Sequence, residues 1–178
     1  MNLHLGCGRR VLPGFINSDR FVDDVGLEKH DILNLPYPDE SADLILAEHM
    51  IEHLTFQEEE EFCREAYRVL KRGGVLEVEV PDMEWLRRTF LEGQDKFREF
   101  YKVGAVDHYF GNGRATDQRW GITTAHFFGN QNGQGQFHYC AYTDAKLKHV
   151  AFMAGFPSCV TETIFNKGAQ CLRARIVK

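Results

Sequence analysis

The sequence predicts a single α/β domain built around a doubly wound, mostly parallel sheet, and three observations lead to that prediction. Short apolar segments alternate with helical patterns, which is typical of parallel strands joined by crossover helices. Glycines directly follow the first apolar segment, where such sheets bind ligands. Two strand-like segments end the chain in succession, which predicts an antiparallel hairpin at one sheet edge. The length, 178 residues, suits one domain spanning 1–178.

The first crossover of this sheet is unusually short. Four apolar segments precede the first clear helix, and the third of them is the weakest. They lie at 2–5, 15–18, 27–30 and 42–47. Gly8 and Asp19 are only 11 residues apart, which is too few for a usual helix followed by a strand. We therefore expect the first crossover helix to be truncated to a loop or one turn, which leaves one face of the sheet less covered.

The clearest helix begins after Thr55. Thr55 and Glu58 have the spacing of a capping box, in which each side chain bonds the other residue's backbone amide. Apolar residues then recur at helical spacing. Lys71 and Arg72 are expected in the last turn, where cations suit the helix dipole, and Gly73 in the left-handed position that ends the helix.

The rest of the chain combines regular elements with an irregular insert. We expect a strand at 74–80, a helix at 83–103 and an irregular segment at 104–142. A second helix at 143–154 and two strands at 160–165 and 171–177 then follow. So long a segment without a period is usually functional in a compact domain, so we interpret 83–142 as a helix plus a lid over the substrate.

The composition excludes several classes of function. The net charge is −5 and no basic block is present, so nucleic acid is not an expected partner. No apolar run is long enough to span a membrane, and the first residues lack the pattern of a signal peptide. The five cysteines show neither a disulfide framework nor the spacing of a structural zinc site. We expect a reduced, cytoplasmic protein.

Several short motifs, taken in order, carry a resemblance. They are Leu-His-Leu-Gly-Cys-Gly (3–8), Phe-Ile-Asn-Ser-Asp (15–19), Leu-Pro-Tyr-Pro-Asp (35–39), Ala-Asp-Leu-Ile-Leu-Ala-Glu-His (42–49) and Arg-Val-Leu-Lys-Arg-Gly-Gly (68–74). Together they resemble the class I, Rossmann-like methyltransferases that depend on S-adenosylmethionine (SAM). More narrowly, the chain is similar to short bacterial members of the methyltransferase-11 type that are often linked to glycan and polysaccharide synthesis.

The resemblance implies a SAM site at the carboxyl edge of the sheet. The glycine loop would lie under the methionine part, Asp19 would accept hydrogen bonds from the ribose, and Asp31 with Ile32 would hold the adenine. The implied cofactor residues are Leu5, Gly6, Cys7, Gly8, Asp19, Arg20, Asp31, Ile32, Glu48 and His49. Because the first crossover is so short, Asp23 and Asp24 remain alternatives to Asp19 for the ribose.

The same resemblance implies transfer of the SAM methyl group to an oxygen or nitrogen of a small acceptor, such as a sugar or related metabolite. An alcohol acceptor must lose a proton, which suits a histidine near neutral pH. His126 and His138 lie in the insert that should close over the methyl group, so they are the expected catalytic residues. A homodimer is left open.

The implied strand order 3-2-1-4-5-7-6 makes a further prediction. Glu77 and Glu79 share one face of their strand, and Arg173 and Arg175 share one face of theirs. Those two strands would be antiparallel neighbours. We expect the four side chains to form a cross-strand charge ladder on a partly wet or dimer-covered face.

Two other functions compete with methyl transfer. His49-Met50-Ile51-Glu52-His53 fits His-x-x-Glu-His, a zinc hydrolase pattern in which Glu52 would be the base. The resemblance instead assigns this stretch to the cofactor site and to packing, so no metal site is expected. The second alternative is a SAM-binding module that has lost catalysis and acts as a scaffold.

Overall fold

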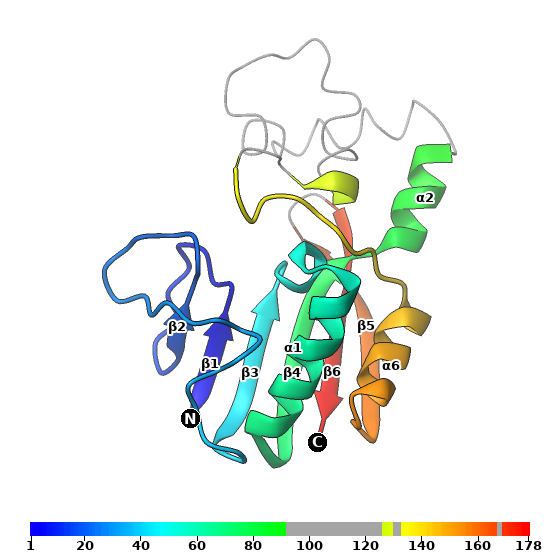
Figure 1. Ribbon diagram of the computed structural model, residues 1–178. Helices are drawn as coiled ribbons and strands as arrows, with labels where there is room; N and C mark the ends of the chain where they lie inside the picture. Colours follow the sequence, from blue (N-terminus) through cyan, green and yellow to red (C-terminus); the bar gives the residue numbers. More distant parts are fainter. Residues whose placement is uncertain (92–125, 130–132, 167–168) are drawn as a thin grey trace.

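The computed structural model describes residues 1–91, 126–129, 133–166 and 169–178, and within them six strands form one mixed sheet (Figure 1). The strands are β1 (Asn2–Leu5), β2 (Ile16–Ser18), β3 (Ala42–Glu48), β4 (Leu70–Pro81), β5 (Ser158–Asn166) and β6 (Ala169–Val177). Their order is β2-β1-β3-β4-β6-β5. The first four are parallel, and β6 runs antiparallel to both β4 and β5. The Rossmann-like α/β sheet with an antiparallel C-terminal edge hairpin is thus confirmed.

Helices cover one face of this sheet. They are α1 (Phe56–Val69) and α6 (Asp144–Met153), which pack side by side, while α2 (Met83–Leu91) and the short 3-10 helix η1 (Ile51–His53) lie near its carboxyl edge (Figure 1). The core lies between the sheet and α1 with α6, and its fully buried side chains include Leu3, Ile45 and Phe62. Of the expected helix at 83–103, the part from residue 92 lies outside the described residues.

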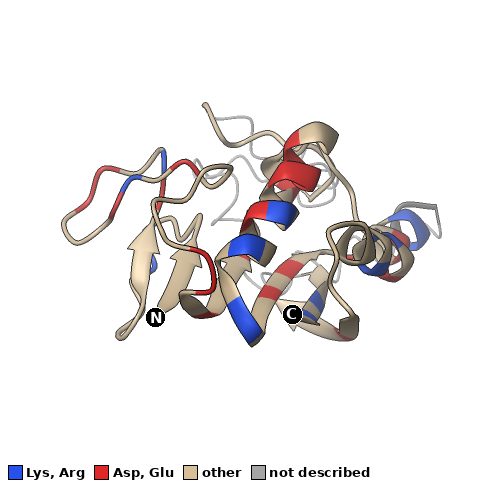
Figure 2. Ribbon diagram, turned by 60° about the horizontal axis from the view of Figure 1, so that its bottom comes forward, with Lys and Arg blue, Asp and Glu red and all other residues tan. Residues whose placement is uncertain are grey.

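Local capping signals set where α1 begins, but tertiary pairing sets where it ends. The capping box of Thr55 and Glu58 is present, and acidic residues in the first turns of α1 give way to basic ones later (Figure 2). The helix stops at Val69, because Leu70 is already extended and pairs with Ala42 of β3. The prediction that Lys71 and Arg72 lie in the last turn, with Gly73 just beyond it, is therefore wrong.

The first crossover contains no helix, as expected from its length. Residues 6–15 form turns, which the Asn17 side chain holds through hydrogen bonds with the amide and carbonyl of Leu12 and the carbonyl of Phe15. Segment 27–30 forms no strand, only an isolated bridge between Glu28 and Ser18. The sheet is the expected order without its outermost third strand.

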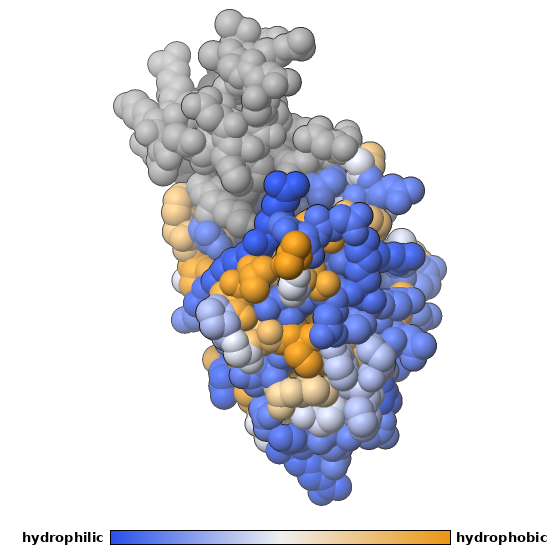
Figure 3. Space-filling view, turned by 90° about the vertical axis from the view of Figure 1, so that its left-hand side faces the viewer, coloured by the Kyte–Doolittle hydropathy of each residue, from blue (hydrophilic) through white to orange (hydrophobic). Residues whose placement is uncertain are grey.

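This trimmed edge exposes apolar surface. Figure 3 views the molecule from the side of β2 and the loop that follows it, and apolar side chains gather on this face. The exposed large apolar residues of these segments are Val11, Phe21 and Val25. The edge beside β2 is thus apolar and exposed, while lower coverage of one sheet face stays a prediction.

The predicted charge ladder forms in part. On the neighbouring strands β4 and β6, Glu77 lies opposite Arg175, and Glu79 lies opposite Arg173. Arg173 lies 3.1 Å from Glu79, 3.9 Å from Glu77 and 3.5 Å from Glu162 of β5. Within the described residues no ion pair reaches Arg175. Glu79 is 1% exposed, so the Glu79 end of the ladder is buried from solvent.

Two further observations concern cysteines and membranes. All five cysteines are free thiols, as the absence of a disulfide framework in their spacing predicts. None of the described helices is both long enough and apolar enough to cross a membrane.

The ladder predicts unequal contributions of its two arginines to stability. Arg173→Met should lower the free energy of unfolding by about 1 kcal/mol, because three carboxylates then lose the half-buried guanidinium that pairs with them. Arg175→Met on the same face is the matched control, with an expected change within about 0.5 kcal/mol. Urea denaturation checks both variants, and equal midpoints for the two would contradict the prediction.

Candidate cofactor and acceptor site

A cavity of about 1000 Å³ opens at the carboxyl edge of the parallel strands. Residues that follow β1, β2 and β3 line it, together with Pro81 at the end of β4. Residues 134–139 line it as well; they belong to the segment 133–143 before α6, which we call the late segment. This is the position at which open α/β sheets bind ligands. The cavity is large enough for a cofactor and a small acceptor together.

The glycine loop after β1 forms the floor of the cavity. Gly6 has φ +64°, and a Cβ atom there would lie 2.2 Å from Cγ of Met50, so no larger residue fits. Gly8 has φ +57° and faces open space, with no atom within 4 Å of where a Cβ would be. Because Gly6 and Gly8 have no side chains, the loop backbone is accessible from the cavity, as close approach of a ligand requires.

Asp19 joins the glycine loop to the end of β2. Its Oδ2 accepts a hydrogen bond from the Gly8 amide at 2.8 Å, and its Oδ1 accepts bonds from the amides of Phe21 and Val22 at 2.8 and 3.0 Å. Asp19 lines the cavity, whereas its two alternatives, Asp23 and Asp24, do not. Asp23 instead pairs with Lys29 on the surface.

Most of the other expected cofactor residues lie on the same cavity. Gly6, Cys7, Gly8, Arg20, Asp31, Ile32, Glu48 and His49 all line it. Leu5 does not, because its side chain is 1% exposed and packs in the core beneath the loop. Burial, with a smaller contribution from Asp19, raises the pKa of Cys7 to about 11, so this side chain stays a neutral thiol that packs.

Glu48, at the end of β3, contributes a carboxylate to the cavity wall. It forms an ion pair with Arg10 of the glycine loop and lies 3.8 Å from Nε2 of His4. Burial lowers the pKa of His4, whose Nδ1 bonds Asn17 at 3.2 Å. Arg10 was not among the expected residues, because nothing local in the sequence brings it to Glu48.

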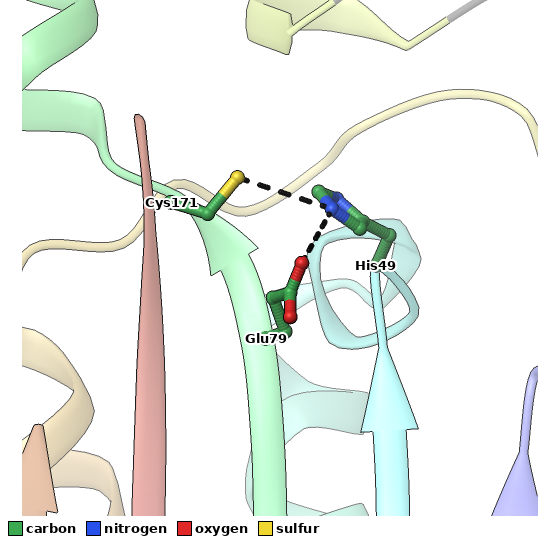
Figure 4. Close-up of side chains that lie close together, drawn as sticks. All are labelled: His49, Glu79 and Cys171. Carbon is green, nitrogen blue, oxygen red and sulfur yellow. Dashed lines mark hydrogen bonds and ion pairs between the residues drawn. The ribbon is translucent and has the colours of Figure 1, made fainter. Parts of the chain in front are cut away.

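His49 lies between two buried carboxylates. Its Nδ1 is 3.2 Å from Oε1 of Glu52, and its Nε2 is 3.3 Å from Oε1 of Glu79 and 3.9 Å from Sγ of Cys171 (Figure 4). Burial lowers the pKa of His49, but the contacts with Cys171, Glu52 and Glu79 outweigh it and raise the pKa to about 11. The ring is therefore an imidazolium that donates to both carboxylates.

This geometry does not form the zinc site of the competing His-x-x-Glu-His interpretation. That motif needs both histidines on one face of a continuous helix, but only Ile51–His53 is helical, as a single 3-10 turn. His49 precedes the turn with φ 50° and points to Glu79 rather than beside His53. Both of its ring nitrogens are occupied by carboxylates.

The expected catalytic histidines reach the cavity from the late part of the chain. His126 and His138 both line it, and Nδ1 of His138 donates to the His126 carbonyl at 2.9 Å. The ring of His138 meets that of His53 edge to face, with centroids 4.6 Å apart. His53 was not expected near them, since this contact joins positions 85 residues apart.

Known proteins share both the fold and part of the sequence. Residues 15–78 match the sequence profile of the methyltransferase domain family. An ajmaline N-methyltransferase from Rauvolfia serpentina is 36% identical over 67 residues, which are 38% of this chain and 22% of that enzyme. The chain therefore spans under a quarter of this curated relative's length.

Two solved structures extend the likeness over the whole chain. A SAM-dependent methyltransferase from Archaeoglobus fulgidus has a TM-score of 0.60 at 16% identity, covering 99% of this chain and 85% of that one. The 1,6-didemethyltoxoflavin-N1-methyltransferase of Burkholderia thailandensis, solved with S-adenosylhomocysteine, has a TM-score of 0.62 at 13% identity, covering 99% and 70%. The chain thus shares its fold with these SAM-dependent methyltransferases, and residues 15–78 are similar to methyltransferase domains.

The buried charges predict how stability depends on pH. Burial raises the pKa of Glu79, but His49, Asn166 and Arg173 outweigh it and lower the pKa from 4.5 to about 2. Since the folded value lies below the unfolded one, the stabilisation is complete above about pH 4.5 and is lost as the pH falls toward 2. Glu79→Gln should lower the free energy of unfolding by about 3 kcal/mol at pH 7 and flatten its loss in acid.

Urea denaturation over a pH series measures both effects. Glu77→Gln is the matched control, since Glu77 shares the face of β4 but contacts Arg173 only at 3.9 Å. Its acid profile should follow that of the unmodified protein. An unchanged acid profile for Glu79→Gln would contradict the prediction.

Proposed function

We propose that the chain binds SAM in the carboxyl-edge cavity and transfers its methyl group to an oxygen or nitrogen of a small acceptor. The observation that carries the proposal is that one cavity collects the glycine loop after β1, Asp19 after β2, Asp31 of the following loop and Glu48 at the end of β3. The match of residues 15–78 to methyltransferase domains supports it independently.

Each part of the cofactor has a proposed partner. The bare backbone of Gly6 and Gly8 lies under the methionine part, and the carboxylate of Asp19 accepts bonds from the ribose hydroxyls. Asp31 bonds the adenine amino group, with Ile32 against the ring. An acidic cavity wall suits this cofactor, because the sulfonium carries a positive charge.

The acceptor lies on the side of the cavity formed by the late segment. We propose His126 and His138 as the catalytic residues, since both line the cavity, and the ring of His138 contacts that of His53. Methyl transfer is an in-line displacement, so the protein mainly orients the acceptor, excludes water and removes a proton from a hydroxyl acceptor. The 83–142 insert, within one domain 1–178, is proposed to form this half of the site.

We also propose a sugar-like acceptor, a cytoplasmic location, a small-molecule partner and a homodimer surface. The resemblance to short bacterial methyltransferases linked to polysaccharide synthesis supports a sugar or related metabolite as acceptor. Five free cysteines support a reducing, cytoplasmic location. The net charge of −5 supports a small-molecule partner over nucleic acid. The exposed apolar edge beside β2 is where a homodimer would bury surface.

The cofactor site is tested by calorimetric titration with S-adenosylhomocysteine. Asp19→Ala should weaken binding about tenfold or more, because a charged hydrogen-bond acceptor contributes roughly 1.5–3 kcal/mol. Asp23→Ala is the matched control and should bind within about twofold of the unmodified protein. No binding by the unmodified protein would overturn the proposed function, and a reversed order of the two variants would move the ribose contact to Asp23.

The acceptor side is tested with labelled SAM and a panel of hydroxyl and amine acceptors. His126→Ala and His138→Ala should lower turnover about a hundredfold while leaving S-adenosylhomocysteine affinity unchanged. His149→Ala on the exposed side of α6 is the control. Unchanged turnover in both site variants would refute the catalytic assignment. Cofactor binding without turnover on any acceptor would favour the scaffold alternative.

A further inference from the structure

A second group of ligating side chains lies beside the proposed acceptor position. Glu52 and His53 come from η1, and His138 comes from the late segment 85 residues further along the chain. One ligand atom from each lies within 4.8 Å of the other two, and all three residues line the cavity. The cavity is thus open to a group that these atoms would bind.

The two histidines are already oriented as metal ligands usually are. Nδ1 of His53 lies 2.9 Å from the Phe137 carbonyl, and Nδ1 of His138 lies 2.9 Å from the His126 carbonyl. A carbonyl only accepts, so each Nδ1 carries a proton, which leaves Nε2 of each ring as the nitrogen that could ligate a metal. A metal-binding histidine typically donates its other ring N–H to a carbonyl or carboxylate in this way.

Glu52 supplies an independent indication of a missing ligand. Its side chain is 1% exposed, and its Oε2 is buried with no hydrogen-bond partner within the described residues. Oε1 bonds His49 at 3.2 Å, so the carboxylate is held on one side only. A buried carboxylate oxygen without a partner is costly, which indicates a cation or donor that completes the site.

We propose that Glu52, His53 and His138 bind a divalent zinc ion on the acceptor side of the cavity. Two imidazole nitrogens and one carboxylate oxygen form a ligand set that zinc uses in sites with an open fourth position. Zinc bonds of about 2 Å place the ligand atoms of a tetrahedral site roughly 3.3 Å apart. Side-chain rotations that move these atoms by about 1 Å would therefore bring them to binding distance. The hydrogen bond from His49 to Glu52 would orient the ligating carboxylate.

The neighbouring group of His49, Glu79 and Cys171 does not compete for this ion. Its ligand atoms also lie within 4.8 Å of one another (Figure 4). Both ring nitrogens of His49 already lie against carboxylates, at 3.2 Å from Glu52 and 3.3 Å from Glu79. In the Glu52 group, by contrast, one buried carboxylate oxygen has no partner among the described residues, and both histidines are held through Nδ1 alone.

The ion also narrows the acceptor class, on the condition that the proposed methyl transfer is correct. A fourth coordination position that faces the cavity binds oxygen ligands well. It therefore favours acceptors that carry a hydroxyl or carboxylate over amine acceptors without an oxygen ligand. Zinc would lower the pKa of a bound hydroxyl, so His138 would act by holding the ion rather than by accepting the acceptor's proton itself.

The site is tested by titrating metal-free protein with Co²⁺, a coloured substitute for zinc, and by competing with Zn²⁺. We expect one equivalent to bind with visible bands of nitrogen and oxygen ligation and no thiolate charge-transfer band. His53→Ala and His138→Ala should each weaken binding about tenfold or more. His149→Ala removes an exposed histidine and should bind like the unmodified protein.

Two further measurements separate the alternatives. Cys171→Ser should leave the Co²⁺ spectrum unchanged, and a thiolate band that it removes would move the ion to the other group and overturn the proposal. Absence of stoichiometric Co²⁺ or Zn²⁺ binding would overturn it as well. Calorimetry with S-adenosylhomocysteine on the same metal-free protein reports on the cofactor site alone, and circular dichroism verifies that each variant folds.

Discussion

The arrangement of the whole site depends on one buried cation, the imidazolium of His49. It lies between the carboxylates of Glu52 and Glu79, and Arg173 completes an alternating series of four charges. Any one of the inner charges would be costly to bury alone, whereas the alternation lets each oppose the desolvation of the next. The series joins η1, the end of β3, β4 and β6, so ion pairs connect the elements at the carboxyl edge of the sheet in addition to apolar packing.

The backbone at His49 explains why the chain turns where it does. Its φ of 50° lies in the left-handed region, which costs a non-glycine residue roughly 1–2 kcal/mol. The His49 amide donates to the Glu79 carbonyl at 2.7 Å, and the ring contacts hold the conformation further. This turn leaves Glu48 facing the cavity, sets Met50 beneath Gly6 and begins η1. The carbonyl of Glu52 then accepts the amides of Tyr139 and Cys140, which attaches the late segment.

Local signals in the sequence therefore predicted more of the fold than of the site. Thr55 and Glu58 cap a helix wherever it packs, and the alternation of charges on β4 and β6 is a property of each strand alone. The end of α1 was mispredicted because pairing of Leu70 with β3 overrides the helix signals that follow it. The contact of His53 with His138 has no local signature, since only the tertiary fold joins positions so far apart.

The short first crossover changes what Asp19 has to do. No helix follows β1 here, and within the turns at 6–15 the Gly8 amide donates to the Asp19 side chain instead. The carboxylate has about four acceptor positions, and the amides of Gly8, Phe21 and Val22 occupy three of them. Oδ1 is fully used, so the one position left for a ribose hydroxyl is on Oδ2, beside Gly8. In the proposed cofactor site, recognition of the ribose would thus be coupled to the conformation of the glycine loop through the Asp19 carboxylate.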